Sequence, residues 1–122
     1  APRVARFVAD LAGFYTMLDR YEEAEPLFVR AVDTLAWELG PAHLDVLMVR
    51  TALAGLYLQE TRYAEAEPIY RDVLTILLDM PDRDQDHLAT VLDEYALLLR
   101  RTGRDTDALT LEARARGLQD PV

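Results

Sequence analysis

The chain has 122 residues, a formal net charge of −9, and 51% apolar against 29% charged residues, which predicts one folded domain. Its negative charge repels phosphate backbones and acidic membrane surfaces, so we expect neither nucleic acid nor a membrane as a partner. Cysteine, serine, asparagine and lysine are absent, which removes thiolate metal sites, serine and cysteine nucleophiles and Schiff-base lysines from the available chemistry.

The first residues, APRVARFVAD, contain no signal-peptide core, and no apolar run approaches the roughly eighteen residues of a membrane span. We therefore expect a cytoplasmic location. The chain does not begin with methionine, which favours a part of a longer protein.

Residues 1–42 predict two amphipathic helices, because apolar side chains recur at helical spacing in both halves. Gly40 and Pro41 predict the end of the second helix, since glycine accepts a left-handed conformation and proline cannot continue a helix. The apolar positions are Val4, Phe7, Val8, Leu11, Phe14, Tyr15 and Leu18 in the first helix, and Ala24, Leu27, Phe28, Ala31, Val32, Leu35 and Ala36 in the second.

Residues 43–84 repeat this unit. The stretch LAGFYTMLDRYEEAEPLF at residues 11–28 matches LAGLYLQETRYAEAEPIY at residues 53–70 at ten of eighteen positions, a shift of 42 residues. The turn between the two helices holds Asp19 in the first unit and Thr61 in the second. Aspartate accepts a left-handed conformation there, whereas threonine does so at a cost.

Residues 85–122 form a third, more divergent unit with Gly103 at the same turn position. Glu112 and Arg116 stand where the earlier units have apolar side chains, and their spacing of four favours a solvated pair. We expect a polar C-terminal cap, because a terminal repeat needs a polar outer face.

The motifs Leu-Ala-Gly-x-Tyr, Arg-Tyr-x-Glu-Ala-Glu-Pro and Leu-Gly-Pro-Ala-His-Leu-Asp-Val, with their period of 42, resemble the kinesin-light-chain type of tetratricopeptide repeat. The resemblance implies an all-α fold, a right-handed superhelical solenoid of three helix-turn-helix repeats and six helices. It also places small residues at the helix contacts. These are Ala12, Ala54 and Ala96 in the first helices, and Ala24, Ala66 and Ala108 in the second.

Four groups of polar or aromatic side chains invite a chemical interpretation, and the sequence favours a structural one for each. Glu22, Glu23, Glu25, Glu65 and Glu67 lie in the first turns of helices, where carboxylates complement the helix dipole, and we expect them to face solvent. Asp82, Asp84, Asp86 and Asp93 imitate a calcium loop but have His87 in place of its glycine, which favours helix capping. His43 and His87 have no clustered partners for zinc. Trp37 is expected to pack or to contact a partner. We expect no catalytic site, no metal and no cofactor.

The resemblance further implies a concave groove lined by the first helix of each repeat. Its residues here are Arg6, Ala9, Gly13, Thr16 and Met17, then Met48, Thr51, Gly55, Leu58 and Gln59, then Thr90, Asp93, Leu97, Arg100 and Arg101. Gly13 and Gly55 would let a partner's backbone come close, and Gln59, Thr51 and the arginines would act as donors.

The first helix is more apolar than its internal copies, because Val8 stands where the second unit has Arg50. We expect Val4, Phe7 and Val8 to form an interface with an upstream repeat or domain, or with another copy of the chain. The leading function is a non-catalytic protein–protein interaction module or scaffold that docks a protein segment or a neighbouring domain through the groove. The alternative is a structural, self-associating solenoid.

Overall fold

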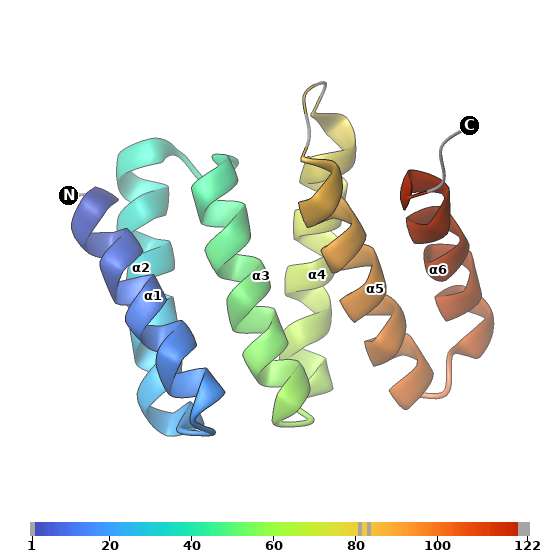
Figure 1. The fold of residues 1–122 in the computed structure, drawn as a ribbon, viewed down its shortest axis with the longest axis horizontal. Helices are drawn as coiled ribbons and strands as arrows, with labels where there is room; N and C mark the ends of the chain where they lie inside the picture. Colours follow the sequence, from blue (N-terminus) through green and yellow to red (C-terminus); the bar gives the residue numbers. More distant parts are fainter. Residues whose placement is uncertain (1, 81, 83, 120–122) are drawn as a thin grey trace. The chain divides into compact units, whose positions relative to one another are not determined.

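The computed structural model describes residues 2–80, 82 and 84–119, and over these residues the chain forms six α-helices and no strand (Figure 1). The helices are α1 (Pro2–Met17), α2 (Tyr21–Leu39), α3 (Leu44–Gln59), α4 (Tyr63–Asp79), α5 (Gln85–Arg101) and α6 (Asp105–Gln119). Along the chain they follow one another as three helix-turn-helix units, as the sequence predicts.

The chain divides into two compact units, Ala1–Arg62 and Tyr63–Val122. In the first unit, α1 and α3 both pack on α2. In the second unit, α4 and α6 both pack on α5. None of the described helices is both long and apolar enough to cross a membrane.

The turns within the three helix pairs share one backbone geometry. Asp19 and Thr61 both have a φ of 60°, and Gly103 has a φ of 81°. The next residue in each turn donates its N–H to a carbonyl five residues earlier. The three backbone hydrogen bonds run from Arg20 to the Tyr15 carbonyl at 2.9 Å, from Arg62 to the Tyr57 carbonyl at 2.8 Å and from Arg104 to the Leu99 carbonyl at 2.7 Å. The predicted left-handed residues are therefore confirmed.

The ends of the helices also follow the sequence. Gly40 has a φ of 95°, and its N–H bonds the Ala36 carbonyl at 3.0 Å, which ends α2. Asp84 caps α5 by accepting the His87 N–H at 3.1 Å. The predicted capping role is thereby confirmed for Asp84.

The small residues predicted at the helix contacts are all buried. Each of the six alanines is at most 1% exposed: Ala12, Ala24, Ala54, Ala66, Ala96 and Ala108. Since a methyl group is the whole of the alanine side chain, helix axes can approach closely at these positions.

Candidate partner-binding surfaces

The first unit contains an open cavity of about 710 Å³, which we name the α1–α3 cavity. It is lined by α1, by α3 and by Phe28 of α2. Five of the predicted groove residues meet here: Arg6, Ala9, Gly13 and Met17 from α1, and Met48 from α3. The other lining residues of these two helices are Asp10, Phe14, Asp45, Val49 and Ala52.

Most residues that line the α1–α3 cavity are apolar, and three of the large apolar side chains are exposed. Met17 is 83% exposed, Phe14 55% and Met48 50%. Methionine side chains adapt to irregular apolar partners because they are unbranched and polarizable. A Cβ atom added at Gly13 would meet nothing within 4 Å, so the space beside this part of α1 is open.

Three of the lining residues are charged: Arg6, Asp10 and Asp45. The Arg6 guanidinium donates from Nε to Oδ2 of Asp45 at 2.8 Å, and its second nitrogen contacts the same oxygen. This ion pair connects α1 with α3, so Arg6 already has a carboxylate partner. Asp10, one turn further along α1, is exposed and adds a second carboxylate to the lining.

The remaining predicted groove residues of the first unit lie outside this lining. Thr51 is buried, and its hydroxyl donates to the Leu47 carbonyl at 2.8 Å within α3. Gln59 accepts a hydrogen bond of 3.1 Å from the Tyr21 hydroxyl. Gly55 is half-buried. Val4 and Phe7 of the predicted N-terminal interface are exposed, and Val8 is half-buried.

In the second unit, Asp93, Arg100 and Arg101 are exposed on α5. The Arg100 guanidinium donates to both carboxylate oxygens of Glu112 on α6, at 2.8 and 2.5 Å. Glu112 therefore binds α5. The hydrogen bond from Arg100 lowers the pKa of Glu112, and the charge of Arg116, its predicted partner, also lowers it. The sequence missed the pair of Arg100 and Glu112 because its partners are twelve residues apart on different helices.

The same polar contact forms twice: between α2 and the turn that follows α3, and between α4 and the turn that follows α5. In the first unit, Arg62 donates to Glu25 at 2.7 Å, and the Tyr57 hydroxyl donates to the same carboxylate at 3.0 Å. In the second, Arg104 donates to Glu67 at 2.7 and 2.8 Å. We call this arrangement the Glu–Arg clasp.

The clasps keep their carboxylates ionised. Hydrogen bonding from Arg62 lowers the pKa of Glu25, and hydrogen bonding from Arg104 lowers the pKa of Glu67, although partial burial opposes both shifts. A general acid needs a raised pKa, so these glutamates suit a structural role. The expectation that they face solvent is corrected for Glu25 and Glu67, which bind the next helix pair.

The second unit also contains a polar pair that the sequence did not indicate, in which one side chain is buried and the other partly buried. Tyr70 is fully buried, stacks on Tyr95 with ring centroids 6.0 Å apart, and donates to Glu94 at 2.7 Å. Burial raises the pKa of Tyr70 and that of Glu94, although the Tyr70 bond favours the Glu94 carboxylate. Burial likewise lowers the pKa of His87.

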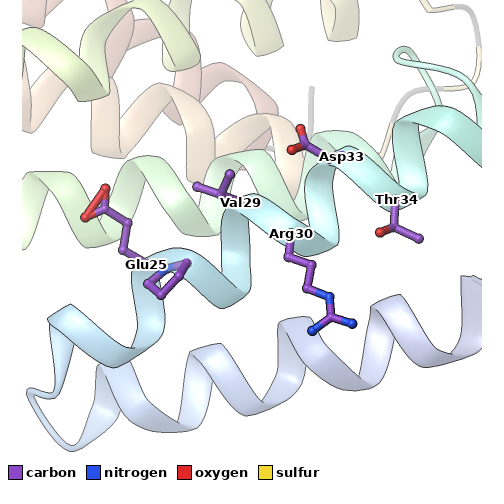
Figure 2. Close-up of a pocket in the computed structure, with 6 residues that line it drawn as sticks. Glu25, Val29, Arg30, Asp33 and Thr34 are labelled. Atoms are coloured by element: carbon purple, nitrogen blue, oxygen red, sulfur yellow. The ribbon is translucent and has the colours of Figure 1, made fainter.

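Two smaller hollows carry less chemistry. One of about 490 Å³ is lined by α2 residues alone: Glu25, Pro26, Val29, Arg30, Asp33 and Thr34. Figure 2 shows Val29 and Asp33 pointing to one side of the helix and Arg30 and Thr34 to the other, so these side chains do not converge. The other, of about 260 Å³, lies beside Tyr95 and Arg104.

Trp37 on α2 is 89% exposed, so it does not pack in a core.

A sequence model described as "Tetratricopeptide repeat" matches residues 5–79, which is more than half of the chain. The chain belongs to the tetratricopeptide repeat family. No curated protein matches it in sequence.

Solved structures agree with this family in their fold. The chain is similar to BtubC (BKLC) from P. vanneervenii, with a TM-score of 0.92 and 21% identity over 98% of this chain and 48% of that one. It is also similar to two structures of a Podosopora anserina putative kinesin light chain with nearly identical TPR-like repeats, one of them a Q17M structure. Their TM-scores are 0.83 and 0.84 at 22% identity, over 97% and 98% of this chain and 56% of theirs. The chain thus spans about half the length of these structures, and the predicted tetratricopeptide solenoid is confirmed.

Proposed function

We propose that this chain is a non-catalytic interaction module that docks a segment of a partner protein in the α1–α3 cavity. Tetratricopeptide repeats generally serve as protein–protein interaction scaffolds. The observation that carries the proposal is the lining, in which Phe14, Met17 and Met48 are each at least half exposed around one cavity. Exposed apolar side chains gathered in a hollow can bury the apolar side chain of a partner.

The chemistry of the cavity favours one kind of segment. An apolar anchor would contact Phe14, Met17 and Met48, and the partner's main chain would pass beside Gly13. Asp10 is an exposed carboxylate, whereas Arg6 is already paired with Asp45. Together with the net charge of −9, this favours a segment with basic residues next to its apolar anchor.

Selection of binding peptides tests this proposal. A display library of random short peptides is panned against the chain, and the selected peptides are measured by titration. We expect an apolar residue flanked by lysine or arginine, and a loss of affinity of about tenfold or more when Met17→Glu and Met48→Glu are combined. Leu109→Glu is the control, because Leu109 is 54% exposed on α6 of the other unit. Peptides that bind the double variant as well as the unaltered chain would contradict the proposal.

The other predicted groove positions and the cytoplasmic location stay predictions. Hydrogen bonds hold the side chains of Thr51, Gln59 and Arg100. Among the described residues, none holds the side chain of Asp93 or Arg101. Arg101→Glu therefore tests an acidic partner in the second unit more cleanly than Arg100→Glu, which also breaks the contact with Glu112.

The alternative function, self-association through the first helix, is favoured by the exposure of Val4 and Phe7 at 59% and 68%. Sedimentation equilibrium over a wide range of concentrations tests it. A self-associating chain dissociates when Phe7→Glu is introduced. A chain that is monomeric throughout the range excludes this function.

A further inference from the structure

The outer face of α1 repeats positions that α3 and α5 bury. This face consists of Val4, Phe7, Leu11 and Phe14, with Leu18 directly after the helix, and these side chains are between 37% and 68% exposed. The four α1 positions have eight counterparts 42 and 84 residues later. Two of these, Val49 and Tyr95, are partly buried, and the other six are at most 7% exposed: Val46, Leu53, Leu56, Leu88, Val91 and Leu98. In the first unit, Val46 clusters with Leu35 of α2, and in the second unit, Tyr95 stacks on Tyr70 of α4.

Arg20, in the turn after α1, is a polar residue whose counterparts also contact a preceding helix. Its counterparts Arg62 and Arg104 bind Glu25 and Glu67, each on the second helix of the preceding pair. Arg20 instead contacts Glu23, three residues further on, at 2.6 Å. Its guanidinium lies 4.9 Å from the centre of the Tyr15 ring, much as Arg62 lies 4.4 Å from that of Tyr57. Arg20 is therefore already placed as Arg62 is.

We propose that the outer face of α1 and Arg20 together dock the second helix of a further repeat of this type on the N-terminal side of α1. That helix would carry a glutamate directly before a proline, as Glu25 and Glu67 do, and an aromatic residue three positions later, as Phe28 and Tyr70 do. The glutamate replaces Glu23 on Arg20, and the aromatic residue packs on the apolar face. This surface is separate from the α1–α3 cavity, although Phe14 borders both.

A second copy of the chain offers no matching helix. On α2 and α4 the required glutamates are held by Arg62 and Arg104, and Phe28 and Tyr70 are buried. On α6 the equivalent positions hold Leu109 and Glu112, and Arg100 binds Glu112. The occupant is therefore a repeat with its own free glutamate.

An extended chain tests the proposal. A copy of residues 1–42 is fused directly before residue 1, which continues the period of 42. Amide hydrogen exchange is followed in α1 of the original chain. We expect exchange there to slow by about tenfold or more, because the added second helix covers the outer face. Glu25→Gln within the added copy should reverse part of this protection, whereas Glu22→Gln in that copy, an exposed position in the first turn, should not.

Phe7→Glu in the original α1 gives a second measurement. In the unextended chain it should leave the unfolding midpoint almost unchanged, since Phe7 is 68% exposed, but it should abolish the protection in the extended chain. An extension that leaves α1 exchange unchanged overturns the proposal. Equal effects of Glu25→Gln and Glu22→Gln overturn the assignment of Arg20. An unextended chain that dimerises through Phe7 identifies a second copy as the occupant and overturns it too.

Discussion

The contact of α2 with α3 and the contact of α4 with α5 use the same sequence positions but differ at their centres. Both have a Glu–Arg clasp at one end. At the centre of the first, Phe28 borders the open α1–α3 cavity, whereas at the centre of the second, Tyr70 stacks on Tyr95 and donates to Glu94. The comparison indicates that the clasp fixes the register of neighbouring repeats while the centre is free to vary.

Truncation of the two central aromatic residues should separate the contacts most strongly. Tyr70→Ala removes a fully buried ring and leaves Glu94 without its donor, so we expect a loss of about 4 kcal/mol in the free energy of unfolding. Phe28→Ala opens a space that joins an existing cavity, so its cost should be smaller, about 3 kcal/mol. Urea denaturation measures both. A larger loss for Phe28→Ala would show that the cavity is not open in solution.

The clasps should respond to acid in both units. Arginine lowers the pKa of Glu25 and Glu67 below the ordinary 4.5, so their stabilisation is present above that pH and is lost as the pH falls through the lowered pKa. We expect Glu25→Gln to cost about 1 kcal/mol at pH 7, with a loss of the same sign for Glu67→Gln. Both losses should shrink when unfolding is measured below the lowered pKa values. A cost that does not depend on pH would exclude the carboxylate charge as its cause.

Glu94 should show the opposite dependence on pH. Burial raises its pKa above 4.5, so the stability that this group contributes is complete below 4.5 and is lost as the pH rises through the raised pKa. Glu94→Gln keeps an acceptor for Tyr70 without the buried charge. We expect it to raise the free energy of unfolding at pH 7 and to have little effect at low pH. Asp93→Asn, at an exposed neighbour, is the control. A destabilised Glu94→Gln variant at pH 7 would mean that the charge is needed.

The turns offer the smallest expected difference. Thr61 has a φ of 60°, where a β-branched side chain is strained, whereas glycine occupies the equivalent Gly103. We expect Thr61→Gly to raise the unfolding midpoint, by the equivalent of about 0.5 to 1 kcal/mol, and Gly103→Ala to lower it by a similar amount. A midpoint that falls for both variants would contradict the strain at Thr61.

Local features of the fold could be predicted from the sequence, because their causes lie within a few residues. The helical spacing of apolar residues predicted the helices, Gly40 predicted the end of α2, and Asp84 predicted the N-terminal cap of α5. The resemblance to tetratricopeptide repeats implied one groove lined by Arg6, Gly13, Met17 and Met48. In the structure these four residues line a single cavity.

Features that depend on the facing helix could not be predicted. Glu25 lies near a helix start, and its local position suggested a solvated carboxylate, whereas its partner Arg62 is 37 residues away. Nothing in the sequence near Glu94 distinguishes it from a surface glutamate, and its partner, the Tyr70 hydroxyl, lies 24 residues away on another helix. The resemblance to tetratricopeptide repeats placed Arg100 in a groove, but it does not show that Glu112 binds Arg100.

The central claim is that the stretch RYxEAEP carries a contact between repeats, and a double-mutant cycle tests it most directly. Glu25→Gln, Arg62→Gln and the double variant are compared by urea denaturation at low salt, with the same cycle at Arg20 and Glu23 as the exposed control. We predict a coupling of about 1 kcal/mol between Glu25 and Arg62, and a clearly weaker one for the control. A coupling between Glu25 and Arg62 no larger than that of the control would contradict the claim.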